Sequence, residues 1–128
     1  MGFLFDTHAL IWWLDGDERF PVSLREEILS NQNRMWVSPV SFWEISVKRS
    51  LGKLELKKIT PQMWYAVDEQ GFSRLPIAIS HLSYLEQLPF HHRDPFDRLL
   101  IAQAQAERHT LLSRDGQFEP YDVACKWG

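Results

Sequence analysis

The sequence predicts an α/β fold, a parallel sheet with helices on its faces. Short apolar runs, which are typical of buried strands, alternate along the chain with segments whose apolar residues recur at helical spacing. Such an alternation is typical of a parallel sheet covered by helices. The chain has 128 residues, which is enough for one hydrophobic core but hardly for two. We therefore expect a single domain over residues 1–128.

Five segments have the length and composition of strands, and turn or capping residues follow several of them. The expected strands are Phe3–Phe5, Arg34–Val37, Phe72–Ile77, Thr110–Ser113 and Val123–Lys126.

Capping residues and prolines mark the starts of six helices. The expected helices begin near Asp6-Thr7, Ser23, Ser38-Pro39, Thr60-Pro61, Ser80 and Pro95, and four of them end near Gly16, Leu29, Gly52 and Asp68, while the last ends near Arg108. In the third helix we expect Val40, Trp43 and Val47 to form one apolar face, with Glu44 beside it.

The composition excludes several classes of protein. Hydrophobic residues make up 45% and charged residues 24%, which is typical of a globular chain rather than a disordered one. No apolar run approaches the roughly 18–20 residues of a membrane span, and the first residues lack the basic region of a signal peptide. The single cysteine, Cys125, excludes an internal disulfide and fits a reducing cytoplasm, where we expect the protein to act.

Four acidic residues are expected at one edge of the sheet. Asp6 and Asp115 each follow a strand, while Glu44 and Asp97 each lie early in a helix. In parallel sheets the strand ends and the starts of the following helices share an edge, where ligands bind. Asp94 is expected to cap the helix that contains Asp97, which brings these two carboxylates close together.

A cluster of carboxylates requires neutralisation. Two unit charges 4 Å apart repel by about 4 kcal/mol at an effective dielectric constant of about 20. Oxygen ligands favour Mg²⁺ or Mn²⁺, and one or two such ions support hydrolysis of phosphodiester bonds. The alternative is that these are ordinary surface acids, since the 17 acidic residues offer many accidental groups of four.

Four segments, in order along nearly the whole chain, resemble the motifs of PIN-domain ribonucleases, and within that group the VapC toxins of bacterial toxin–antitoxin pairs. The segments are Phe3-Leu4-Phe5-Asp6-Thr7-His8, Ser41-Phe42-Trp43-Glu44-Ile45-Ser46-Val47-Lys48 with the following Leu51-Gly52-Lys53-Leu54, Asp94-Pro95-Phe96-Asp97-Arg98-Leu99-Leu100-Ile101-Ala102-Gln103-Ala104, and Leu111-Leu112-Ser113-Arg114-Asp115.

This resemblance implies a three-layer α/β/α sandwich and Mg²⁺-dependent endoribonuclease activity, for which Mn²⁺ is expected to substitute. It implies that Asp6, Glu44, Asp97 and Asp115 are the catalytic metal ligands, with Asp115 the least uniform of them in the family. It also implies a homodimer and a cognate antitoxin whose tail blocks the active site.

Further residues are candidates for supporting roles, and each has an ordinary structural alternative. Thr7 and Asp94 are expected either to support the metal ligands or to cap helices. Several cations near the acids are expected to contact RNA phosphates or simply to be solvated; they are Arg93, Arg98, Arg114 and Lys48. Because the net charge is −3, any binding of nucleic acid requires a local basic patch, and Lys48 belongs to the basic cluster that ends at Lys58.

The histidines and tryptophans give weaker signals. His91 and His92 are adjacent, so their side chains diverge, and the five histidines show no zinc-binding spacing. Most of the six tryptophans are expected in the core. Any others would suit a dimer or antitoxin surface, or would stack on bases.

Two other functions compete with the nuclease. One is a PIN-like module that binds RNA or a protein without cutting, although such a protein would have no reason to keep a costly acidic cluster. The other is a phosphoryl-transfer enzyme with an aspartyl nucleophile. The sequence Asp6-Thr7-His8 lacks a second acid two residues after the first, which argues against it.

Overall fold

The computed structural model describes residues 2–30 and 34–128. Its sheet has five parallel strands in the order β3-β2-β1-β4-β5. The strands are β1 (Phe3–Phe5), β2 (Met35–Val37), β3 (Ser73–Arg74), β4 (Thr110–Leu112) and β5 (Cys125–Lys126). In the register of the sheet, Phe3 of β1 is opposite Met35 of β2 and Thr110 of β4.

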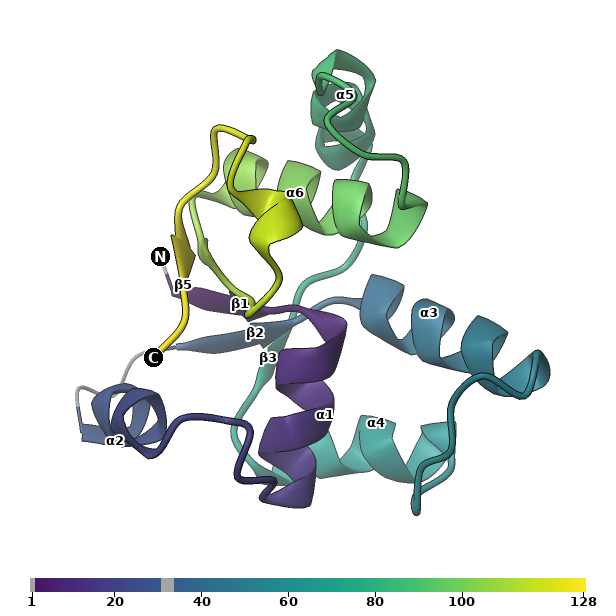
Figure 1. The fold of residues 1–128 in the computed structure, drawn as a ribbon, viewed down its shortest axis with the longest axis vertical. Coiled ribbons are helices and arrows are strands. Elements are labelled where there is room, and N and C mark those ends of the chain that lie inside the picture. Colours follow the sequence, from purple (N-terminus) through teal and green to yellow (C-terminus); the bar gives the residue numbers. More distant parts are fainter. Residues whose placement is uncertain (1, 31–33) are drawn as a thin grey trace.

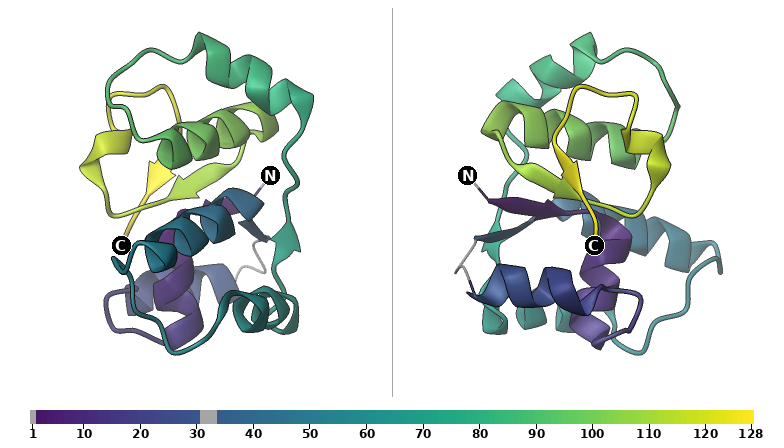
Figure 2. Two further views of the ribbon diagram at one scale, coloured as in Figure 1. Left: turned by 90° about the vertical axis from the view of Figure 1, so that its right-hand side faces the viewer. Right: turned by 60° about the vertical axis from the view of Figure 1, so that its left-hand side comes forward.

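Six helices and a short 3-10 helix accompany the sheet in the described part of the chain. They are α1 (Thr7–Asp15), α2 (Val22–Ser30), α3 (Pro39–Ser50), α4 (Thr60–Glu69), α5 (Ile79–Gln87), α6 (Pro95–Glu107) and η1 (Gly116–Phe118). Helices α5 and α6 cover one face of the sheet, and α1, α2 and α4 cover the other (Figures 1 and 2). This confirms the three-layer α/β/α sandwich. Helix α3 contacts α1, α4 and α6, so it joins the two helical layers at one end of the sheet.

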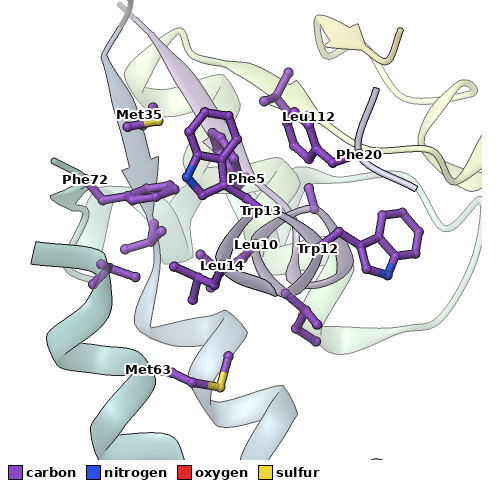
Figure 3. Packing of buried hydrophobic residues seen from close by; sticks show 14 of the residues in the cluster. Phe5, Leu10, Trp12, Trp13, Leu14, Phe20, Met35, Met63, Phe72 and Leu112 are labelled. Carbon is purple, nitrogen blue, oxygen red and sulfur yellow. The ribbon is translucent and has the colours of Figure 1, made fainter. Parts of the chain in front are cut away.

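The two faces of the sheet support two hydrophobic cores. Successive strand residues point to opposite faces, so Phe5 and Leu112 pack against α1 and α4, whereas Leu4 and Leu111 pack against α6. In the first core the ring of Phe5 lies 5.6 Å from that of Trp13 and 4.8 Å from that of Phe72, in edge-to-face arrangements (Figure 3). These aromatic contacts anchor α1, and with it the acidic residue at its start.

The sequence predicted the positions of the six α-helices and the five strands, but several boundaries differ. Helix α2 begins at Val22, so Ser23 lies inside it rather than at its cap. Helix α4 is capped by Ile59, and Thr60 is its first residue. The strand expected over residues 72–77 is limited to Ser73–Arg74. The 3-10 helix η1 was not predicted.

The apolar face predicted for α3 is wrong. Trp43 is 51% exposed and Val47 is half-buried, whereas the buried face is formed by Val40, Ser41, Phe42, Glu44 and Ile45. Glu44 therefore belongs to the buried face instead of lying beside it.

Within the described residues, no helix combines the length and the apolar character needed to cross a bilayer.

Candidate metal centre

Asp6 lies directly after β1 and is the N-cap of α1. Its backbone N–H donates to the Leu112 carbonyl oxygen at 3.1 Å, which places it at the ends of both β1 and β4. Its Oδ1 accepts from the Ala9 N–H at 2.8 Å. Burial raises the pKa of Asp6 to about 6, although hydrogen bonds from Ser113 and Ala9 lower it in part. Asp6 is thus a desolvated carboxylate held by the start of a helix.

Glu44 lies on the buried face of α3 and is 4% exposed. The Thr7 hydroxyl donates to its Oε1 at 2.6 Å, and the Lys48 ammonium pairs with its Oε2 one helical turn later. Two donors therefore satisfy the carboxylate, as burial of a charged group requires. The Thr7 contact also links Glu44 to the residue next to Asp6.

Asp97 lies in the first turn of α6. Asp94 is the N-cap, and its Oδ1 accepts from the N–H groups of Phe96 and Asp97 at 2.9 and 3.1 Å. Burial, followed by the charge of Asp94, raises the pKa of Asp97 to about 7, and the charge of Glu44 adds to the effect. Its Oδ2 lies 3.2 Å from His92 Nε2. The carboxylate of Asp97 therefore lies in the field of two other acids and contacts one histidine.

Asp115 is the N-cap of η1, where its Oδ1 accepts from the Gln117 N–H at 2.9 Å. Together with Asp6 it lines a cavity of about 350 Å³. The remaining lining residues are His8, Trp12, Arg19 and Arg114. The guanidinium of Arg114 lies 4.6 Å from the centre of the Trp12 ring, so a cation and two acids line the same cavity.

The structure brings the four acids to one end of the sheet but does not close them around a point. Glu44 raises the pKa of both Asp6 and Asp97, so it lies within electrostatic range of each. Asp115 joins the group through the cavity it shares with Asp6. In residues 2–30 and 34–128, no three His, Cys, Asp or Glu side chains are arranged as a ready-made metal site.

The chemistry of the four side chains fits a hard divalent cation, because all of their ligating atoms are carboxylate oxygens. The conformation also shows what such an ion would have to replace. Lys48 supplies the positive charge beside Glu44 and is also attracted by Asp94 and Asp97. A cation bound between Glu44 and Asp97 would therefore compete with the ammonium of Lys48.

The other predicted residues fall into two groups. Thr7 contacts a predicted ligand directly, and Asp94 both caps α6 and acts on Asp97. Arg93 and Arg114 are exposed, as a phosphate contact requires, while Lys48 is half-buried against Glu44.

The prediction that Arg98 contacts phosphate is contradicted. Arg98 is 5% exposed, and its guanidinium donates to the carbonyl oxygens of Pro89 and Leu88 and to the hydroxyl of Tyr121. Its donors are thus used to hold the segment before α6. It is a structural residue, which its charge alone did not reveal.

Sequence reasoning missed a contact of Asp97. His92 lies between Asp97 and Tyr121, with Nδ1 2.7 Å from the Tyr121 hydroxyl oxygen. The only signal in the sequence is that His92 precedes Asp97 by five residues. Tyr121 follows His92 by 29 residues, so no local pattern links the two.

Comparisons with known proteins agree with the fold. The chain is similar in structure to the VapBC2 complex of Rickettsia felis bound to a DNA fragment from its promoter, with a TM-score of 0.73 and 16% identity over 100% of both chains. It is also similar to the DNA-bound VapBC of Salmonella typhimurium, with a TM-score of 0.69 and 17% identity over 98% of this chain and 97% of the other. It is similar as well to FitAcB of Neisseria gonorrhoeae, with a TM-score of 0.62 and 18% identity over 96% of this chain and 95% of the other.

At these identities the similarities show the fold. No curated protein sequence matches the chain. The PIN domain family matches residues 3–124, which include all four of the clustered acids. The chain therefore belongs to the PIN-domain family.

Proposed function

We propose that this protein is a divalent-metal-dependent endoribonuclease, formed by a single PIN domain over residues 1–128. The observation that carries the proposal is the position of Glu44 between the other two acids. Thr7, the residue after Asp6, donates to Glu44 Oε1 at 2.6 Å, and the charge of Glu44 adds to burial and to Asp94 in raising the pKa of Asp97. A fold gains no stability from such repulsion. A cation bound by the three carboxylates would offset this repulsion, so a metal site explains why the acids lie close together.

Asp6, Glu44 and Asp97 would hold Mg²⁺, or Mn²⁺ in its place, and Asp115 would complete the set from the shared cavity. When bound, the ion supplies Lewis acidity toward a phosphodiester and lowers the pKa of water. Thr7 would hold Glu44 through the 2.6 Å hydrogen bond between its hydroxyl and Oε1. Asp94 would fix the first turn of α6, and hence Asp97, through its two capping hydrogen bonds.

The cations around the acids would bind the RNA backbone. Arg93 and Arg114 are exposed, and Arg114 lies at the cavity that Asp6 and Asp115 share. Lys48 is close enough to Glu44 to pair with it, so a metal ion that replaced its ammonium would free it to contact a phosphate. These positions supply positive charge locally in a chain whose net charge is −3.

We further propose that the protein is the toxin of a toxin–antitoxin pair acting in the cytoplasm as a homodimer. The structural neighbours include VapBC complexes and a toxin–antitoxin complex from Klebsiella pneumoniae. Helix α5 and the loop after it expose apolar side chains that suit a protein partner; they are Ile79, Leu82, Tyr84 and Phe90. An antitoxin would insert a basic side chain near Asp97, where carboxylates favour an arginine or lysine.

A second candidate is a PIN-like module that binds RNA or a protein without cutting. The pairing of Glu44 with Lys48 favours it, because a permanent internal cation would leave less reason for a metal ion. The two functions differ in their response to metal. Only the nuclease would cleave the RNA, and only in the presence of Mg²⁺ or Mn²⁺.

Cleavage of a structured RNA by the purified protein, with Mn²⁺ and with EDTA, tests the nuclease. We expect cleavage with Mn²⁺, none with EDTA, and none with the Asp97→Asn variant. Asp122→Asn is the matched control. Asp122 is an exposed acid outside the candidate site, so removing its charge should leave the cleavage rate unchanged. Cleavage by Asp97→Asn at the wild-type rate would contradict the assignment of the site.

The resemblance to VapC toxins implies an antitoxin encoded in a small reading frame beside this one, and co-expression with the product of that frame tests it. We expect the two proteins to elute together from a size-exclusion column at micromolar concentration. An Asp97→Arg variant should weaken the complex, because it places a like charge where the partner's basic side chain would bind. Separate elution of the two wild-type proteins would count against the partner.

A further inference from the structure

His92 lies between the candidate metal ligand Asp97 and Tyr121. Its Nδ1 is 2.7 Å from the Tyr121 hydroxyl oxygen, and its Nε2 is 3.2 Å from Asp97 Oδ2. The histidine side chain is 9% exposed, and Tyr121 is 4% exposed. The imidazole is thus held at both ring nitrogens in a nearly dry environment, so the position of its proton has structural consequences.

The hydrogen-bond partners of Tyr121 determine where that proton lies. The Tyr121 hydroxyl oxygen accepts from the His92 backbone N–H and from Arg98 Nη1, each at 3.2 Å. Two donors use both lone pairs of a hydroxyl oxygen, which leaves it one proton to donate. The His92 carbonyl oxygen is 3.4 Å away, whereas Nδ1 is 2.7 Å away. Tyr121 therefore donates to Nδ1.

The tautomer of His92 follows from this assignment. An Nδ1 that accepts a hydrogen bond carries no proton, so in the neutral ring the proton lies on Nε2. The Nε2–H group then donates to Asp97 Oδ2. The result is a directed chain that begins at the guanidinium of Arg98 and passes through Tyr121 and His92 to the carboxylate of Asp97.

We propose that His92 is a positioning residue for Asp97, which it holds in one orientation for metal binding through a hydrogen bond fixed by Tyr121. This role rests on the proposed metal-dependent function. Asp97 needs such a donor because Asp94 and Glu44 both repel its charge. Hydrogen-bond partners outside the ligand set commonly orient a ligand in this way, and their loss weakens metal binding by roughly 10- to 100-fold.

A purely structural role for the His92 ring is less well supported. Arg98 already holds the segment before α6 through Leu88 and Pro89. Tyr121 contacts the backbone N–H of His92 as well as the ring Nδ1, so part of its contact with His92 does not depend on the ring. The contact that requires the imidazole at Nε2 is the one with Asp97.

Nitrogen-15 NMR of the histidine rings tests the geometry, whether or not the protein cleaves RNA. We expect His92 in the wild-type protein to be the Nε2–H tautomer. In Tyr121→Phe the donor to Nδ1 is lost, and we expect a mixture of the two tautomers. A wild-type His92 with its proton on Nδ1 would overturn the proposal.

Calorimetric titration with Mn²⁺ alone tests the role. We expect His92→Ala to weaken Mn²⁺ binding by about 10- to 100-fold. His92→Gln should recover part of the affinity, because its amide nitrogen can donate from a position close to that of Nε2. His91→Gln is the matched control: His91 is exposed, and its ring packs edge-on against Tyr121 at 4.8 Å.

The outcomes separate this proposal from the nuclease. Weaker Mn²⁺ binding in His92→Ala, with recovery in His92→Gln and no change in His91→Gln, supports the positioning role even if no RNA is cleaved. Unchanged Mn²⁺ affinity in a folded His92→Ala protein would overturn it. So would a failure of His92→Gln to bind better than His92→Ala, because the hydrogen bond would then not be the cause.

Discussion

The two sides of the acidic site are held in different ways. On one side, Asp6 accepts a hydrogen bond from the Ala9 N–H as the cap of α1, and Glu44 accepts one from the hydroxyl of Thr7. On the other side, Asp97 lies in the field of Asp94 and Glu44, and its side-chain partner is His92. Burial raises the pKa of both Asp6 and Asp97, and Glu44 adds to both shifts, but Asp97 also lies beside a second acid, Asp94.

This difference indicates which side responds to ligands. Hydrogen bonds that already satisfy a buried carboxylate make its orientation independent of an ion. A carboxylate whose pKa other acids raise is stabilised by any added positive charge. We therefore expect the Asp97 side to govern the dependence on metal and pH, and the Asp6–Glu44 side to govern stability.

The largest expected effect is on cleavage. Asp97→Ala, Asp6→Ala and Glu44→Ala should each lower the rate of RNA cleavage by more than about 100-fold, the upper end of the effect of losing a residue outside the ligand set. Stability distinguishes the two sides further. It is measured for each variant by urea unfolding in the presence of EDTA. Asp6→Ala should be destabilised through its lost cap, and Asp97→Ala should not. Equal destabilisation of both variants would contradict the difference between the two sides.

The pH dependence of stability, measured with EDTA, is the next effect. The pKa values of Asp97 and Asp6 are raised from 3.8 to about 7 and about 6. Between about pH 4 and pH 7 the folded state therefore binds more protons than the unfolded state, and these residues make the protein less stable as the pH rises. Burial lowers the pKa of His109, which gives the opposite trend.

The decisive quantity is thus the difference between variants. The asparagine in Asp97→Asn cannot ionise, so the stability of this variant should fall less as the pH rises. The variant should be at least as stable as wild type at pH 8. Thermal unfolding at pH 5 and pH 8 provides the measurement, with Asp122→Asn as the matched control. If the two variants showed the same pH dependence, the charge at Asp97 would not be the cause.

A smaller effect concerns Thr7. Thr7→Val keeps the shape of the side chain but leaves the buried Glu44 Oε1 without its donor, so we expect a loss of about 1–3 kcal/mol in the free energy of unfolding. Thr7→Ser keeps the hydroxyl and should lose less. Urea unfolding of the two variants compares them directly. Thr7→Val as stable as Thr7→Ser would show that the contact adds nothing.

The smallest effect is that of the α6 cap. Asp94→Ala should cost about 1 kcal/mol of stability, measured by thermal unfolding, and should keep most of the cleavage activity. Asp94→Asn retains a capping oxygen and should cost less. A loss of activity in Asp94→Ala as large as that in Asp97→Ala would place Asp94 among the metal ligands instead.

The parts of the molecule that the sequence predicted are those determined by neighbouring residues. Ser38 and Asp94 were expected as caps, and Asp6 was one of two candidates beside Thr7, because a cap depends on a side chain and the backbone two or three residues later. The strands were found because buried parallel strands form continuous apolar runs. The order of these elements was enough to bring the four acids to one end of the sheet.

The parts that were missed depend on contacts between distant segments. Arg98 is buried because carbonyl oxygens of the preceding loop and Tyr121 satisfy its donors, which no local pattern reveals. The face of α3 was misread because Trp43 is exposed while Glu44 is buried. From hydrophobicity alone, Trp43 would be expected inside and Glu44 outside. A prediction based on apolar spacing therefore fails where a site buries an acid.

The central claim is that the clustered acids form one metal site, and melting curves with and without metal test it most directly. Wild type, Asp97→Asn and Asp122→Asn are each unfolded with EDTA and with millimolar Mn²⁺. Binding to the folded state alone stabilises a protein by about 2.7 kcal/mol at a hundred times Kd. We predict a higher melting temperature with Mn²⁺ for wild type and Asp122→Asn, and little change for Asp97→Asn. An equal shift in all three proteins, or none in wild type at saturating Mn²⁺, would contradict the claim.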